Sequence, residues 1–182
     1  MNPELIETLR MAQRFGFFGR RQIEDSIEHS MEFARALAEV SDGARIIDLG
    51  TGGGLPGLVL AHEFPHSNVT LIDRRQKRTD FLEQAVLRLR WSHVTVRCAD
   101  VDVVVSEVST KTLTPYDVVT ARGFGPPELT LRTAVRLANQ EGRIVISEPP
   151  SGDRWPPELL SELGLQSSRV GAVQLFHVKH SD

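Results

Sequence analysis

The sequence predicts a doubly wound α/β fold, in which helices cover both faces of a mostly parallel sheet. From about residue 44 onward, apolar runs rich in valine and isoleucine alternate with helical patterns, as in consecutive βαβ units. The first of these runs leads into a glycine-rich stretch and then a helix, an order that is typical of this fold. A chain of 182 residues, 40% of them hydrophobic, is also long enough to bury one ordinary core.

Two helical stretches precede the alternating part of the chain, at roughly 3–14 and 22–40. The glycines of residues 16–19 separate them, because glycine interrupts a helical pattern. We expect these helices to cover the sheet. A single domain is therefore predicted, with residues 1–43 as an N-terminal helical cap and residues 44–182 as the Rossmann-like core.

The elements of the core follow from local pattern. Helices are expected from near Pro56, where proline suits a first helical turn, and at 77–89 and 127–138. The apolar run from Val101 fits a helix or a strand equally well. Beyond Pro149, a short helix at 157–163 and a weakly alternating stretch at 170–179 predict a closing antiparallel hairpin. Parallel strands are predicted at 45–49, 68–72, 94–98, 116–121 and, after a turn at Glu141–Gly142, at 143–147.

Composition argues against several classes of protein. The net charge of −3 does not suit a general nucleic-acid coat protein, whose affinity comes from accumulated Lys and Arg. Cys98 is the single cysteine, which excludes an internal disulfide and a multi-cysteine metal site, and no metal is expected. Charged residues interrupt the N-terminus, and no apolar stretch approaches the roughly 20 residues of a membrane span. We expect a cytoplasmic protein without a membrane segment, and a monomer.

One segment is nevertheless strongly basic. Residues 74–90 hold six basic side chains against two acidic ones, Asp80 and Glu83. The excess of positive charge fits either a solvated helix face or a contact with RNA. The basic residues are Arg74, Arg75, Lys77, Arg78, Arg88 and Arg90.

The glycine-rich stretch carries the clearest functional signal. Five of the eight residues from Gly50 to Gly57 are glycine, directly after a strand and before a helix. Glycines permit positive φ angles and close approach of a ligand to the backbone, and the free N–H groups of the next helix attract negative charge. We expect a nucleotide-like ligand on this turn, in contact with Gly50 and Gly52.

Two carboxylates flank this turn and indicate which cofactor binds. Gly52, Gly54 and Gly57 match G-x-G-x-x-G, and Asp73 follows Gly52 by 21 residues, which a dinucleotide fold would also show. Asp48, however, would repel a pyrophosphate and attract an ammonium group such as that of S-adenosylmethionine. Asp73 could accept hydrogen bonds from the ribose of either cofactor. The alternative is that Asp48 caps the loop and Asp73 caps the following helix.

Several motifs together resemble one family. Residues 48–57 have the sequence D-L-G-T-G-G-G-L-P-G, and they are followed by Leu-Ile-Asp at 71–73, Lys-Arg-x-x-Phe-Leu at 77–82 and Thr-Ala-Arg at 120–122. His29-x-x-Glu32 is similar to the family's His-x-x-Asp element. This order resembles the small-subunit ribosomal RNA methyltransferase G family, also called glucose-inhibited division protein B. The resemblance covers roughly residues 27–148.

The resemblance implies a class I S-adenosylmethionine-dependent methyltransferase. By analogy with the family, Gly50 and Leu55 would contact the cofactor, and Ala99 with Asp100 would match the pair on its adenine side. Arg122 matches an arginine that lies at the cofactor and faces the substrate. Its alternative role is a surface salt bridge. S-adenosyl-L-methionine is therefore the expected cofactor.

The resemblance also implies a substrate, guanine N7 in 16S ribosomal RNA, either free or in the small ribosomal subunit. Neutral N7 already presents a lone pair, so we expect no catalytic acid or base. Phe124 could stack on the unstacked guanine, although a core position is its alternative. Candidate phosphate contacts are Arg74, Arg75 and Arg78, together with Arg20 and Arg21.

Two departures from the family concern the substrate. The N-terminal part is short, and Glu148 stands where a lysine is common, so that its carboxylate would repel phosphate near the substrate mouth. The acceptor could therefore be a small molecule or another RNA. A nucleotide-binding module or an NAD-dependent oxidoreductase, built on the same glycine loop, is the remaining alternative.

Overall fold

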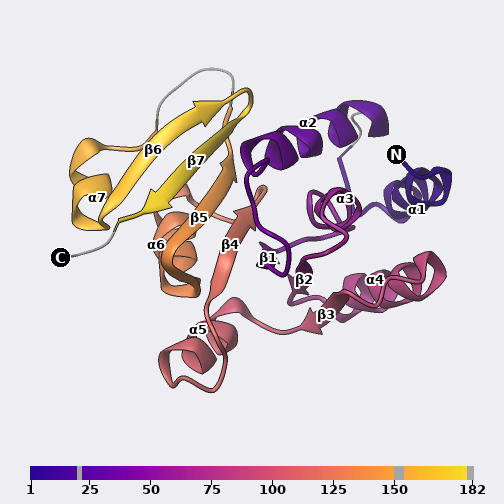
Figure 1. Ribbon diagram of the computed structural model, residues 1–182. Helices are drawn as coiled ribbons and strands as arrows, with labels where there is room; N and C mark the ends of the chain where they lie inside the picture. Colours follow the sequence, from indigo (N-terminus) through magenta and orange to yellow (C-terminus); the bar gives the residue numbers. More distant parts are fainter. Residues whose placement is uncertain (20–21, 150–153, 180–182) are drawn as a thin grey trace.

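The computed structural model describes residues 1–19, 22–149 and 154–179 (Figure 1). The described part contains a seven-stranded sheet with the order β3-β2-β1-β4-β5-β7-β6. Its first five strands pair in parallel, and β7 runs antiparallel to both β5 and β6. The predicted doubly wound α/β class is confirmed. The strands are β1 (Arg45–Leu49), β2 (Asn68–Asp73), β3 (Val94–Cys98), β4 (Tyr116–Ala121), β5 (Ala138–Ser147), β6 (Leu165–Val170) and β7 (Val173–Val178).

Seven helices in the described residues connect or cover these strands. None of them is long and apolar enough to cross a membrane. Figure 1 shows α1 and α4 at one end of the molecule, with α7 and the β6–β7 hairpin at the opposite end. The helices are α1 (Pro3–Arg14), α2 (Ile23–Ala36), α3 (Gly57–Glu63), α4 (Gln76–Leu89), α5 (Val101–Ser109), α6 (Pro127–Leu137) and α7 (Pro157–Glu162).

The sheet separates two hydrophobic cores, because successive side chains of a strand point to opposite faces. Ile46 and Val118 belong to the core shared with α1, α2, α3 and α4. Ile47 and Val119, one residue further along each strand, belong to the core shared with α5, α6 and α7. Strands buried on both faces explain the continuous apolar runs in the sequence.

The N-terminal helices pack on one of these faces. Leu5 and Leu9 of α1 and Phe33 of α2 are fully buried in the first core. The Asn2 side chain caps α1 by accepting a hydrogen bond from the Glu4 N–H at 2.8 Å. α2 ends at Ala36, earlier than residue 40, because Leu37 leaves the helical conformation with a φ of −107°.

The apolar run from Val101, which the sequence left open, forms helix α5. Asp100 caps it, since its Oδ1 accepts a hydrogen bond from the Asp102 N–H at 3.1 Å. Val104 and Val105 bury one side of the helix in the second core. An N-cap aspartate and one buried side therefore decide between helix and strand here.

The last part of the chain closes the sheet as an antiparallel hairpin, as predicted, but two strands begin earlier than expected. β5 starts at Ala138 instead of 143, and the predicted turn is a bulge inside it where Glu141 has a φ of 69°. β6 starts at Leu165, and its next four residues are exposed. A polar strand at the sheet edge shows no apolar alternation, which explains why the sequence pattern did not reveal β6.

Candidate functional site

The glycine-rich loop joins β1 to α3 at the carboxyl edge of the sheet. Gly50 and Gly52 have a φ of 60° and Gly54 a φ of 103°, values that favour glycine. The Thr51 N–H donates to the Ile72 carbonyl at 3.0 Å, which ties the loop to β2. This hydrogen bond keeps the loop backbone at the carboxyl ends of β1 and β2. The sequence predicted a loop in this place, between a strand and a helix.

Asp73, at the end of β2, links the loop to the start of α4. Its Oδ2 accepts hydrogen bonds from the Gly52 N–H at 3.0 Å and from Arg78 Nη1 at 3.1 Å. Its Oδ1 accepts one from the Arg75 N–H at 2.9 Å. An ionised carboxylate has about four acceptor positions, so about one remains for a ligand. Only 4% of Asp73 is exposed, and that residue lines a cavity.

Asp48, at the end of β1, lies beneath the loop and is fully buried. Its Oδ2 accepts a hydrogen bond at 3.0 Å from the N–H of Gly57, the first residue of α3. Its Oδ1 accepts another at 2.9 Å from the hydroxyl of Thr120, its partner across the β1–β4 pair. Burial raises the pKa of Asp48 to about 6, although these hydrogen bonds and the charge of Arg122 oppose the rise. Its observed contacts are those of the loop-capping alternative.

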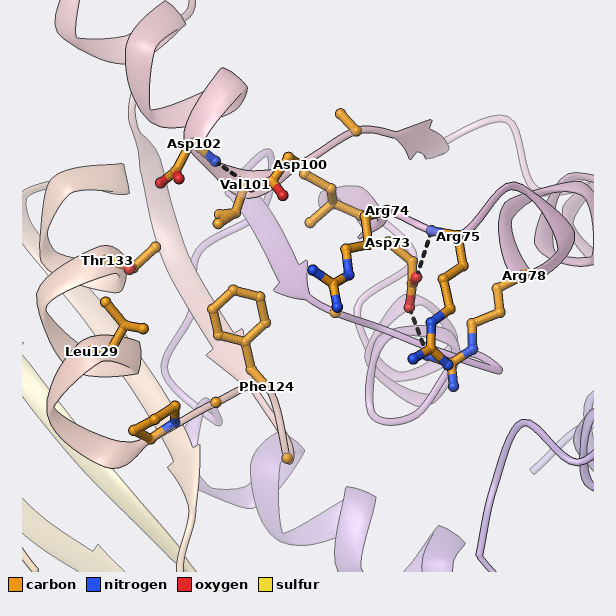
Figure 2. A pocket seen from close by; sticks show the side chains of 16 residues that line it. Asp73, Arg74, Arg75, Arg78, Asp100, Val101, Asp102, Phe124, Leu129 and Thr133 are labelled. Carbon is orange, nitrogen blue, oxygen red and sulfur yellow. Dashed lines mark hydrogen bonds and ion pairs between the residues drawn. The ribbon is translucent and has the colours of Figure 1, made fainter.

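A cavity of about 520 Å³ opens beyond the carboxyl ends of β1, β2, β3 and β4 (Figure 2). This volume is in the usual range for small-molecule and cofactor sites, and the position is where open α/β sheets bind ligands. Its lining carries both signs of charge, with carboxylates from Asp73, Asp100 and Asp102 and guanidinium groups from Arg74, Arg75 and Arg78. A ligand with a cationic and an anionic part would find partners for each. Four of the predicted cofactor residues line this cavity: Gly50, Asp73, Ala99 and Asp100.

Phe124 projects into this cavity from the β4–α6 connection. In Figure 2 its ring lies between Leu129 and Thr133 of α6 on one side and Asp73 with Arg74 on the other. A Cβ placed on Gly50 would come within 2.8 Å of the Phe124 ring, so the ring lies directly on the glycine backbone. Phe124 is half-buried and packs against the second core. Phe124 thus has features of both predicted positions, because its ring faces the cavity and also packs against the core.

The predicted phosphate-binding arginines lie on the side of the cavity away from α6 (Figure 2). Arg74 and Arg75 are exposed, whereas Arg78 is half-buried in its ion pair with Asp73. The three side chains therefore differ in how freely they can meet a ligand. Arg20 and Arg21 lie outside the described residues.

The other four predicted cofactor residues do not line the cavity. Asp48 is beneath the loop, and Gly52 turns its N–H toward Asp73. Leu55 is buried in the first core, 4% exposed. Arg122 extends toward α2, where it donates to the carbonyl and the hydroxyl of Ser26, each at 3.4 Å. These four residues lie behind the residues that line the cavity.

Sequence reasoning missed two groups of neighbours of this site. Leu129 and Thr133 line the cavity from α6, one helical turn apart, and Asp102 lines it from α5. Phe17 and Phe18 lie on the outer side of the glycine loop, where a Cβ on Gly53 would come within 2.7 Å of the Phe18 ring. Two consecutive aromatic residues between glycines were the available signal for this second contact.

The expected repulsion by Glu148 is not what the structure shows. Glu148 is buried, and its Oε1 accepts a hydrogen bond from Arg154 Nε at 2.9 Å. Its Oε2 accepts another from the Trp155 indole N–H at 2.7 Å. The carboxylate charge is neutralised inside the protein, so it presents no free negative charge to a phosphate. Glu148 is thus bound by two residues that follow it in the C-terminal region.

Comparison with known families gives a consistent match. The family model described as rRNA small subunit methyltransferase G matches residues 5–148. A Ribosomal RNA small subunit methyltransferase G from Thermobifida fusca is 31% identical over 179 residues, covering 92% of this chain and 73% of the relative. One from Salinispora arenicola is 39% identical over 119 residues, covering 64% of this chain and 49% of the relative. The chain spans about half the length of most of the curated relatives it matches.

Comparison with solved structures supports the fold class. A SAM-dependent methyltransferase from Aquifex aeolicus superposes with a TM-score of 0.59 and 16% sequence identity, covering 97% of each chain. At this identity the likeness concerns the fold alone. The architecture is that of class I methyltransferases.

Proposed function

The chain belongs to the rRNA small subunit methyltransferase G family, and from this membership we propose that it transfers the methyl group of S-adenosylmethionine to guanine N7 of 16S ribosomal RNA. The observation that carries the proposal is the cavity of about 520 Å³ between the glycine loop, Asp73 and the β4–α6 connection. It lies at the edge of the sheet where this fold binds its ligands.

The lining suits S-adenosylmethionine in shape and charge. The loop backbone at Gly50 approaches the cavity as only a glycine allows, since its φ is 60° and a Cβ would meet Phe124. Asp73 has an acceptor position left for a ribose hydroxyl, and Ala99 with Asp100 offers the adenine side. The carboxylates of the lining also favour a ligand that carries a sulfonium and an ammonium group. Asp48 and Arg122 would act on the cofactor indirectly, Asp48 through its hydrogen bond to the loop and Arg122 through its charge near Asp48.

The cofactor, when bound, supplies an electrophilic methyl group on a positively charged sulfur. Guanine N7 attacks with a lone pair that needs no deprotonation, so this chain need not provide a general base. The carboxylates of Asp73, Asp100 and Asp102 in the lining would favour a positively charged group bound in the cavity. The contribution of the protein is then to orient the two reactants, an effect that can supply roughly 7–11 kcal/mol.

We assign the substrate side to Phe124 and the exposed arginines. The Phe124 ring is seated on Gly50 and open to the cavity, where it can stack on a base that has left its helix. Arg74 and Arg75 lie exposed at the same cavity and can pair with backbone phosphates. Arg78 is held by Asp73 and takes a smaller part in the substrate contact.

A methyl-transfer assay tests the proposal. Tritiated S-adenosylmethionine is incubated with bare 16S RNA, with small ribosomal subunits and with a small-molecule pool, and the labelled product is digested to nucleosides. We expect label in 7-methylguanosine from RNA or subunits. Label that appears in small molecules, or in another nucleoside, overturns the acceptor. Calorimetry with S-adenosylhomocysteine and with NAD tests the cofactor separately, because binding of NAD alone would reject it.

A further inference from the structure

A partly exposed aromatic cluster lies where the end of α1 meets α4. It consists of Phe15, Phe17 and Phe81, whose ring centroids are 5.9, 5.8 and 5.5 Å apart in pairs. Phe15 is 54% exposed although large apolar side chains are mostly buried in this protein. The proposed methyl transfer does not use this cluster. An exposed ring held by two partner rings is a rigid surface against which a flat group can stack.

The aromatic cluster is connected to the cavity through the glycine loop. A Cβ on Gly52 would lie 3.8 Å from the Phe17 carbonyl oxygen and 3.7 Å from Arg78 Nη1. A Cβ on Gly53 would lie 2.9 Å from Phe17 Cβ. Phe17 and Phe18 therefore cover the outer side of the loop whose inner side, at Gly50, faces the cavity. Arg78, which lines the cavity, and Phe17 of the aromatic cluster thus both lie beside Gly52.

Five cations on α4 and just before or after it lack carboxylate partners in the described part of the chain. Within the described residues, Arg74, Arg75, Lys77, Arg88 and Arg90 make no salt bridge, and all five are exposed. Lys77 and Arg88 lie on the same side of α4 as Phe81, by their helical spacing. Several arginines elsewhere are paired with carboxylates, as in Arg10–Glu24, Arg14–Glu7, Arg35–Glu28, Arg97–Glu107, Arg132–Glu162 and Arg143–Glu39.

We infer that the aromatic cluster, with Arg74, Arg75 and Lys77, binds a single-stranded RNA segment beside the target nucleotide, and that one base of this segment stacks on Phe15. The inference rests on the RNA acceptor proposed above. Unpaired cations attract phosphates, and an exposed ring accepts a base of any type once that base is free of its duplex. A duplex offers phosphates but no free base face, so it would use only the cations.

Binding of a labelled RNA tests the surface apart from catalysis. The probes are a fluorescein-labelled single strand of about 12 nucleotides, which is within the usual site size, and the same strand in a duplex. They are titrated by anisotropy with the protein saturated with S-adenosylhomocysteine. We expect Phe15→Ala to weaken single-strand binding about 10-fold and to leave duplex binding unchanged, and Phe15→Trp to bind like the wild type. Each of Arg74→Ala, Arg75→Ala and Lys77→Ala should reduce the salt dependence of single-strand binding by about one phosphate contact.

Leu87→Ala is the matched control, because Leu87 is a large apolar residue of α4 that is 69% exposed and lies outside the aromatic cluster. Wild-type single-strand affinity in Phe15→Ala, or an equal loss in Leu87→Ala, would overturn the inference. The methyl-transfer assay separates the two proposals. If Phe15→Ala weakens binding of the single strand but the wild-type protein methylates no RNA, the proposed acceptor is wrong and the proposed RNA-binding surface stands. A protein that methylates 16S RNA with an unchanged KM in Phe15→Ala keeps the acceptor and disproves the surface.

Discussion

Two carboxylates at the ends of neighbouring strands, Asp48 on β1 and Asp73 on β2, occupy two different regions of the site. Both are buried, and each accepts a hydrogen bond from an N–H of the glycine loop, at Gly57 and Gly52 respectively. Asp48, however, lies under the loop and contacts only protein, whereas Asp73 also borders the cavity. The same residue type at the same sheet edge therefore stabilises the loop in one place and is available to a ligand in the other.

The strand register explains this difference. Asp48 pairs with Leu71 across β1 and β2, so Asp73 lies two residues further toward the carboxyl edge. At that level β1 has already turned into the loop, which leaves the Asp73 carboxylate in front of the loop backbone. Asp48 remains level with Thr120 of β4 and is enclosed by it. A shift of two residues, about 7 Å along a strand, decides which carboxylate can meet a cofactor.

The largest expected effect is a dependence of the free energy of unfolding on pH, and it comes from Asp48. The pKa of Asp48 is raised from 3.8 to about 6 in the folded protein, so the folded form keeps a proton that the unfolded chain releases between these pH values. The free energy of unfolding should therefore fall by about 3 kcal/mol as pH rises through this interval, relative to Asp48→Asn. Urea unfolding of both proteins between about pH 4 and pH 7 measures the difference.

Thr120→Val sharpens this first prediction. It removes a hydrogen bond that favours the ionised Asp48 and so raises the pKa of Asp48 in the folded protein only. The interval of falling stability should therefore extend to higher pH, and the total fall should grow. A difference between wild type and Asp48→Asn that does not change with pH would contradict the assignment of Asp48 as a carboxylate whose ionisation is opposed by burial.

The next effect concerns the cofactor and Asp73. Asp73→Ala should weaken binding of S-adenosylhomocysteine by roughly 1–3 kcal/mol in calorimetry, because the hydrogen bond that a ribose hydroxyl donates to the ionised carboxylate is lost. Asp80→Ala is the control, since Asp80 is exposed on α4 and bonds only Gln76 among the described contacts. Unchanged affinity in Asp73→Ala would remove Asp73 from the cofactor site.

A smaller effect is expected when a glycine of the site is replaced. Two glycines allow the strain in the backbone to be distinguished from the contact with the cavity. Gly50 and Gly123 have nearly equal φ values of 60° and 62°, but only at Gly50 would a Cβ meet a side chain, that of Phe124. Both Gly50→Ala and Gly123→Ala should lose about 1–2 kcal/mol of stability in denaturant unfolding, from the strained φ. Only Gly50→Ala should also lose affinity for S-adenosylhomocysteine in calorimetry. An equal loss of affinity in both variants would show that Phe124 and Gly50 do not shape the cofactor site together.

The smallest effect is expected at Arg78. Its guanidinium pairs with Asp73, whose carboxylate keeps its two backbone donors when the side chain is removed. Arg78→Ala should therefore change affinity for S-adenosylhomocysteine by less than about 1 kcal/mol, the usual range for a partly exposed pair. A loss as large as that of Asp73→Ala would indicate a direct contact between Arg78 and the cofactor.

Much of the fold was predictable because its signals are local. The apolar runs at 45–49 and 116–121 and the glycines after the first run identified a parallel sheet and its glycine-rich turn. The polar strand β6 and the bulge near Glu141 were not predictable, since their positions depend on the neighbouring strands they pair with. The pattern at Val101 was ambiguous until packing against α6 and the Asp100 cap made it a helix.

The candidate site was predictable in composition and less so in arrangement. The sequence by itself determined a glycine turn with positive φ angles, acids at two strand ends and a basic segment, because these depend on residue type and spacing. Only the tertiary structure decided that Asp48 is enclosed, that Glu148 is neutralised by Arg154, and that Phe17 joins Phe81 beside the loop. The physical reason is that strand register and chain packing set which polar groups meet, and the partners come from segments far apart in the sequence.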